Sequence, residues 1–132
     1  MAFRRGFPAM SNRGRNIRFE DACEAVTLFA RERNWSQYHD PKNLSMLLGS
    51  EAGELLAEFR WISNLESDDH AAEPQVYERI KDEIGDVAIS LILLCQRMDV
   101  DLAAAVMAKL QKNAENYPVR DANASPHRLR NE

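Results

Sequence analysis

Apolar residues recur at helical spacing in four segments of this 132-residue chain, and no run alternates between apolar and polar residues as a half-buried strand does. The four segments cover residues 17–33, 42–62, 75–98 and 102–116. Between the first two, Asp40 followed by Pro41 is typical of the start of a helix. We therefore predict an all-α, four-helix bundle-like fold, with a flexible connection at the polar residues 64–74.

The third predicted helix changes character at Asp86. Before this residue a single apolar stripe runs along the helix, whereas from Val87 to Cys95 nearly every face is apolar. A helix that is apolar all round must be buried on all sides, and one small bundle cannot cover it fully. We therefore expect copies of the chain to assemble through this segment, as a homodimer or homotetramer.

The charge of the chain is unevenly distributed. The net charge is −4, but residues 1–18 hold five Arg and no acidic residue, which leaves nine basic and nineteen acidic residues in the body of the chain, 19–117. Such an acidic body is a poor surface for phosphate groups, so we predict no nucleic-acid partner. The basic arm leaves contact with RNA or with an organelle import receptor open.

The length fits one domain, which we place at residues 17–118, between a flexible Arg-rich arm (1–16) and a C-terminal tail (119–132). No apolar run is long enough to span a bilayer or has the form of a signal peptide, which predicts no membrane partner. Both cysteines, Cys23 and Cys95, lie in apolar helical patterns, and this favours a reducing compartment, the cytoplasm.

Two matching tetrads carry the chemistry, Glu51-Ala52-Gly53-Glu54 and Glu83-Ile84-Gly85-Asp86. In each tetrad the two acids are three residues apart, which places them on one face of a helix. Both pairs border the apolar stripe of their helix. If the two helices pack through these stripes, four carboxylates converge.

Four carboxylates at the edge of a core are unfavourable unless a cation neutralises them. Arg79 is the basic residue of these two helices that lies near that face at a helical spacing, and one Arg cannot balance four charges. Oxygen ligands without His or Cys favour magnesium, which manganese can replace, and magnesium often takes further ligands from substrate phosphates. The alternative is that the four acids are solvated surface residues.

The tetrads and their flanking residues resemble the all-alpha nucleoside triphosphate pyrophosphatase (MazG-like) superfamily, and within it the single-domain dCTP pyrophosphatase branch. The resemblance covers roughly residues 19–118. The flanking motifs are Asn34-Trp35-Ser36-Gln37-Tyr38-His39-Asp40-Pro41, Phe59-Arg60-Trp61, Lys109 with Asn113, and Tyr117-Pro118. The resemblance implies a magnesium-dependent hydrolase that converts a nucleoside triphosphate to a monophosphate and diphosphate, with dCTP or a modified dCTP as the first substrate to consider and the removal of unwanted nucleotides as the role.

By this resemblance, Glu51, Glu54, Glu83 and Asp86 hold the metal. Glu54 and Glu58 are the candidates for orienting or deprotonating the attacking water. The third acid of the superfamily usually lies one residue before Glu58, where this chain has Ala57.

The resemblance also implies a substrate-binding set. A tryptophan face can support a base by stacking, and Lys109 and Asn113 can reach phosphates. The set consists of Trp35, His39, Asn43, Trp61, Lys109, Asn113 and Tyr117. Three positions depart from the family pattern: Val26 replaces a His, Ser90 replaces a Tyr, and Asn116 replaces a basic residue.

Other functions stay open at this point. The same reaction on dUTP, on purine nucleotides or on a broad set of nucleotides fits the motifs equally well. A non-catalytic helical interaction module is the alternative from another class, although all four expected ligands are present.

Overall fold

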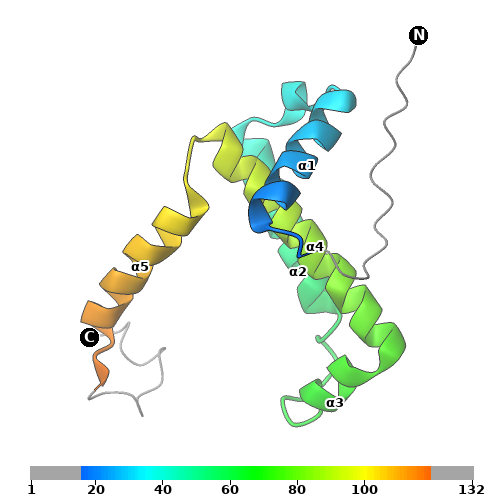
Figure 1. Ribbon diagram of the computed structural model, residues 1–132. Helices are drawn as coiled ribbons and strands as arrows, with labels where there is room; N and C mark the ends of the chain where they lie inside the picture. Colours follow the sequence, from blue (N-terminus) through cyan, green and yellow to red (C-terminus); the bar gives the residue numbers. More distant parts are fainter. Residues whose placement is uncertain (1–15, 120–132) are drawn as a thin grey trace.

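The computed structural model describes residues 16–119 (Figure 1), and all the regular structure in that range is helical. The predicted arm and tail therefore lie outside the described residues, apart from Asn16 and Val119. The elements are α1 (Phe19–Glu32), a 3₁₀ helix (Trp35–Tyr38), α2 (Pro41–Ala57), α3 (Ser67–Ala72), α4 (Pro74–Arg97) and α5 (Leu102–Asn116). The all-α prediction is confirmed, and four of these elements are the four predicted helices.

The centre of the molecule is the pair α2 and α4, which lie side by side over most of the length of α2 (Figure 1). Helix α1 packs against α4, and α3 lies at the end of the pair where α4 begins. The small core consists of Ala30, Leu44, Val76, Ile80 and Ile92. No helix in the described range is both long and apolar enough to cross a bilayer.

Helix α5 forms as predicted but stands apart from the other helices (Figure 1). Its apolar side chains Val106, Met107 and Leu110 are about half exposed or more. The fourth helix of the predicted bundle is therefore present, but within one chain its apolar face is left uncovered.

The second helix ends earlier than predicted, at Ala57 and not at Ile62. After it, Glu58, Phe59 and Ile62 donate their backbone N–H groups to carbonyls three residues back, so the chain continues in tight turns. These turns move Trp61 out of the helix and leave it 85% exposed.

The connection predicted to be flexible contains α3 and is held in place by His70. The His70 Nε2 donates a hydrogen bond of 2.9 Å to the carbonyl oxygen of Glu58. Its ring also packs edge-on against Phe59, with ring centroids 5.9 Å apart. This contact satisfies a carbonyl at the end of α2 that has no partner within the helix.

The start of α2 is fixed by its cap. Asp40 Oδ1 accepts a 2.9 Å hydrogen bond from the backbone N–H of Asn43, and Pro41 occupies the first turn. We expect Asp40→Ala to lower the free energy of unfolding by about 1 kcal/mol, because an unpaired N–H is left at the helix start. Urea unfolding measures this loss. Asp40→Asn, which can still cap the helix, is the control, and equal losses for both variants would contradict the prediction.

Candidate functional site

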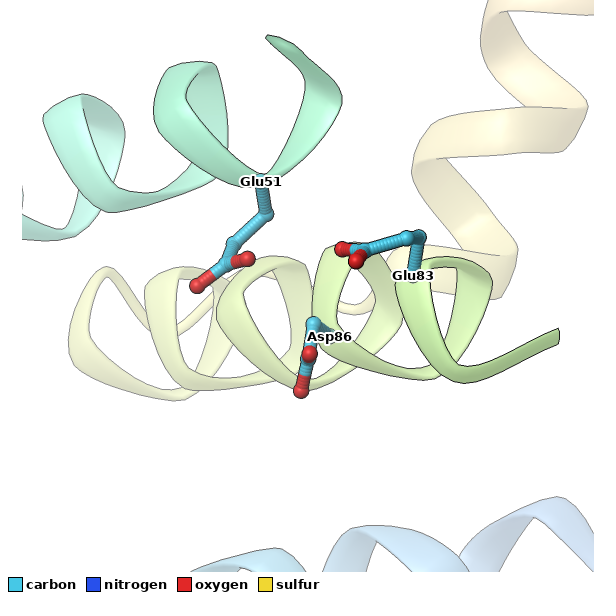
Figure 2. Close-up of side chains that lie close together, drawn as sticks. All are labelled: Glu51, Glu83 and Asp86. Carbon is cyan, nitrogen blue, oxygen red and sulfur yellow. The ribbon is translucent and has the colours of Figure 1, made fainter. Parts of the chain in front are cut away.

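Three carboxylates from the two central helices come together in the structure. Glu51 projects from α2 toward α4, and Glu83 and Asp86 project from α4 (Figure 2). One oxygen of each lies within 4.8 Å of the others, a spacing at which they could hold a single metal ion. Glu51 and Glu83 are half-buried, and Asp86 is exposed. The predicted convergence of the two tetrads therefore occurs where α2 crosses this face of α4.

One oxygen of this cluster lacks a partner. Glu83 Oε2 is inaccessible to solvent and accepts no hydrogen bond from the described residues. A buried carboxylate oxygen without a partner is destabilising as an anion unless a cation compensates it. Three hard oxygen donors, one of them unsatisfied, fit a magnesium-type ion.

The electrostatics of the cluster agree with this geometry. Burial raises the pKa of Glu51 above its usual value, and the negative charges of Asp86 and Glu54 raise it further. Burial also raises the pKa of Glu83, followed by the charges of Glu54, Asp86, Glu51 and Glu58. Glu54 is exposed and lies outside the closest group, but its charge acts on both half-buried acids. The quartet is thus three clustered carboxylates and a fourth beside them.

Glu58, the other candidate for activating water, already has a partner. Its two carboxylate oxygens accept hydrogen bonds from the Nε of Arg79 at 3.3 and 3.1 Å. The Glu58 side chain is only 19% exposed, whereas that of Arg79 is 53% exposed. Arg79 therefore compensates the charge of Glu58, which lies outside the three-carboxylate cluster and is distinct from the neighbouring Glu54.

An apolar cavity of about 290 Å³ lies beside the C-terminal half of α4, beyond the carboxylates. Its lining consists of Ala25, Val26, Phe29, Ala30, Trp35, Ile89 and Leu93. Ile89 and Leu93 follow Asp86 by three and seven residues on α4, so they share a face with it. The cavity therefore begins about one helical turn from the carboxylates.

Of the predicted base-binding residues, Trp35 lines this cavity, and His39 packs against Trp35. The ring of Trp35 packs edge-on against Phe29 and His39, at 5.5 and 6.3 Å between centroids. Asn43 is engaged elsewhere, because its amide donates to Asp40 at 2.7 Å and to the Tyr38 carbonyl at 3.1 Å. These hydrogen bonds give Asn43 a structural role at the start of α2.

The remaining predicted residues are not part of the cavity lining within one chain. Trp61 is outside the cavity lining, and the Arg60 guanidinium lies 5.4 Å from its ring centroid. Lys109, Asn113 and Tyr117 belong to α5 or follow it directly, and α5 stands away from α2 and α4 (Figure 1).

Sequence reasoning missed the cavity wall on α4. The sequence pattern predicts Ile89 and Leu93 only as part of the apolar segment from Val87 to Cys95. The signal was present, because both residues follow Asp86 at helical spacing and so continue its face toward Trp35.

The raised pKa values predict an unusual pH dependence. In the metal-free protein, Glu51 and Glu83 hold protons more strongly when folded than when unfolded, so their contribution to stability is lost as the pH rises above about 4.5. A bound cation removes this penalty. We therefore expect the difference in melting temperature between magnesium-loaded and chelator-treated protein to widen as the pH rises from 5 to 7. A difference that is constant or shrinks over this range would contradict the prediction.

Comparisons with known proteins add three findings. Residues 47–128 match the model of the MazG-like family. Proteins named dCTP pyrophosphatase 1 from Rattus norvegicus and Homo sapiens are 40% and 37% identical over 106 residues. That alignment covers 80% of this chain but only 62% of either relative, so the chain spans less than two thirds of their length. A crystal structure of a pyrophosphatase from Archaeoglobus fulgidus matches with a TM-score of 0.72 and 31% identity, over 80% of this chain and 96% of that one.

Proposed function

The chain belongs to the MazG-like family, and from this premise we propose that it is a metal-dependent nucleoside triphosphate pyrophosphohydrolase. The reaction is nucleoside triphosphate plus water to nucleoside monophosphate plus diphosphate. The observation that carries the proposal is the cluster of Glu51, Glu83 and Asp86, with the unpartnered Glu83 Oε2 and an apolar cavity about one helical turn away. The printed names of the relatives and of the archaeal structure support the same reaction.

Glu51, Glu83 and Asp86, with Glu54 beside them, would hold the metal ion, which we propose to be magnesium. When bound, this ion lowers the pKa of a coordinated water and screens the charge that develops on the phosphates. The carboxylates themselves supply a fixed negative site that attracts the cation but repels the triphosphate. The proposal therefore implies that substrate binds after, or together with, the metal.

Among the acids, Glu54 is placed best to accept the proton of the attacking water. It is exposed and borders the cluster without belonging to the closest group. Glu58 was the other candidate, but both of its carboxylate oxygens already accept hydrogen bonds from Arg79. Its part in catalysis stays a prediction.

The cavity beside Trp35 is the proposed site of the base. Its lining residues contribute apolar and aromatic surface and no amide, carboxylate or hydroxyl side chain. The names of the relatives favour dCTP as the substrate. The apolar lining favours a second candidate, the same reaction on a broader set of nucleotides, because such a wall offers stacking and shape but few hydrogen bonds that could distinguish one base from another.

We also propose that the active form is a homodimer or homotetramer. Only five apolar side chains of the described range are buried in one chain, while Ile84, Ile89, Met107 and Leu110 are all about 40% exposed or more. A second copy that covers α5 would also carry Lys109 and Asn113 into an interface. Placement of this assembly in the cytoplasm stays a prediction.

Pyrophosphate release from the eight canonical nucleotides, dUTP and 5-methyl-dCTP tests the function. We expect release only with magnesium, and its loss in both Glu54→Gln and Asp86→Asn. If the protein hydrolyses dCTP and its 5-methyl derivative alone, the broad substrate set is wrong. If the folded protein turns over no nucleotide, the proposed reaction is wrong.

A further inference from the structure

One face of α4 carries a cation, the carboxylate cluster and the cavity wall in that order. Arg79 lies four residues before Glu83, and Ile89 lies three residues after Asp86. At about 1.5 Å of rise per residue, Arg79 is about 6 Å along the axis on one side of the two carboxylates, and Ile89 is about 4.5 Å on the other. The steps of three and four residues keep all four on neighbouring positions of one face.

Arg79 is only partly engaged by its present partners. Its Nε–H donates to Glu58, and its Nη1 donates to the carbonyl of Gln75 at 3.4 Å. A guanidinium has five N–H groups, and within the described residues the others, including both on Nη2, make no hydrogen bond. More than half of the side chain is exposed. Because the Arg79 half of this ion pair is open to water, its remaining N–H groups are accessible to a second anion.

We propose that Arg79 binds the terminal phosphates of the substrate and, after hydrolysis, the diphosphate product. This inference rests on the proposed function and adds a residue to its site. With the base in the cavity beside Ile89 and the phosphates crossing the carboxylates, the far end of the triphosphate points toward Arg79. The planar guanidinium matches two phosphate oxygens, which a single ammonium group cannot do.

The negative charge of the site explains why a cation such as Arg79 is needed to bind phosphates. The site combines Glu51 and Glu54 of α2 with Glu83 and Asp86 of α4, and Glu58 is close enough for its charge to act on Glu83. A triphosphate adds further negative charge to it. Lys109 lies on α5, away from this face in one chain, whereas Arg79 is already in contact with Glu58.

The proposal is tested by equilibrium binding in the presence of magnesium, which requires no catalysis. The affinity for inorganic pyrophosphate reports the end of the site that binds the terminal phosphates, and the affinity for dCMP reports the end that binds the base. We expect Arg79→Gln to weaken pyrophosphate binding at least about tenfold and to leave dCMP binding within twofold. Arg79→Lys keeps the charge without the fork and should restore part of the loss. Lys81→Gln is the matched control, because Lys81 is another α4 cation, and it pairs with Glu78 at the surface. It should change neither affinity.

A merely structural role for Arg79 predicts a different result for the Glu58→Gln variant. If Arg79 acts only by holding Glu58, then Glu58→Gln should weaken pyrophosphate binding as much as Arg79→Gln does. If Arg79 holds phosphate, Glu58→Gln frees the guanidinium, and pyrophosphate should bind as tightly as in the wild type or more tightly. Equal losses in these two variants, or unchanged pyrophosphate binding in Arg79→Gln, overturns the inference.

Kinetic measurements distinguish a failure of the Arg79 inference from a failure of the proposed hydrolase function. With dCTP, Arg79→Gln should lower kcat/KM at least about tenfold, while any slower hydrolysis of dCDP, which lacks the last phosphate, should change much less. Active wild-type protein whose Arg79→Gln variant loses dCTP and dCDP turnover equally contradicts the inference alone. Wild-type protein that is inactive on every triphosphate contradicts the proposed function, and the pyrophosphate affinities still decide what Arg79 binds.

Discussion

Glu83→Gln is expected to abolish metal-dependent pyrophosphate release and, in the metal-free protein, to raise the melting temperature. Both effects follow from the position of one carboxylate. Glu83 is half-buried, its Oε2 has no partner within the described residues, and burial together with four neighbouring acids raises its pKa. Glutamine keeps the shape of the side chain and removes the charge, so repulsion in the empty cluster falls. The same change removes a ligand oxygen of high charge density from the proposed metal site.

The size of the two effects differs. Loss of one charged ligand should lower kcat/KM by at least about a hundredfold, because the bound cation screens charge that develops in the transition state. Melting curves with magnesium and with chelator should show a higher melting temperature than wild type without metal, and little further rise when magnesium is added. This opposite movement of stability and activity is the mark of a site organised for a ligand and not for the stability of the empty fold.

Asp82→Asn is the control for Glu83→Gln. It removes a carboxylate from the neighbouring position of α4, where the side chain is exposed and outside the cluster. We expect its activity and its magnesium-dependent stabilisation to match the wild type. A Glu83→Gln variant that melts below wild type without metal and still hydrolyses nucleotides would show that the cluster is an ordinary surface group.

Local signals in the sequence predicted the limits of most helices. Helices α2 and α5 begin as expected because Asp40 and Asp101 each cap the first turn through a hydrogen bond to a backbone N–H three residues later. Such a cap depends only on neighbouring residues, so it can be read from the sequence. Family membership, predicted from the acidic tetrads and their flanking motifs, is confirmed.

The end of α2 depended on contacts distant in sequence. Periodicity continues to Ile62, but the helix stops at Ala57, where His70 of α3 takes up the carbonyl of Glu58 and Arg79 of α4 takes up its carboxylate. Neither partner belongs to the segment whose pattern was analysed. The convergence of Glu51, Glu83 and Asp86 was predictable because it needs only two helices that pack through their apolar stripes.

The position of α5 could not be predicted for a different reason. Periodicity shows that a helix has an apolar face but not which surface covers it. Lys109 and Asn113 were expected at the phosphates, and within one chain α5 does not carry them there (Figure 1). A second copy of the chain could cover this apolar face of α5, as the proposed oligomer requires.

Leu110→Glu is expected to dissociate the proposed oligomer and to lower activity with it. Leu110 lies one turn from Val106 and Met107 on the apolar face of α5, and all three are at least 48% exposed in the single chain. If that chain were the whole active molecule, a charge at such an exposed position would have almost no effect. In an interface between copies the same charge has to leave water without a partner, which is strongly unfavourable.

Ala108→Glu is the matched control for Leu110→Glu. Position 108 is also exposed and on α5, but two residues away around the helix, on the side opposite Leu110. Both substitutions add the same charge to the same helix, so differences between them report the face and not the helix. Sedimentation velocity at micromolar concentration should show an oligomer for wild type and Ala108→Glu and a monomer for Leu110→Glu. Pyrophosphate release should fall in Leu110→Glu alone, because Lys109 and Asn113 border the same face and can reach a neighbouring site only when it is docked. Wild-type protein that sediments as an active monomer would contradict the oligomer and leave the apolar face of α5 to another partner.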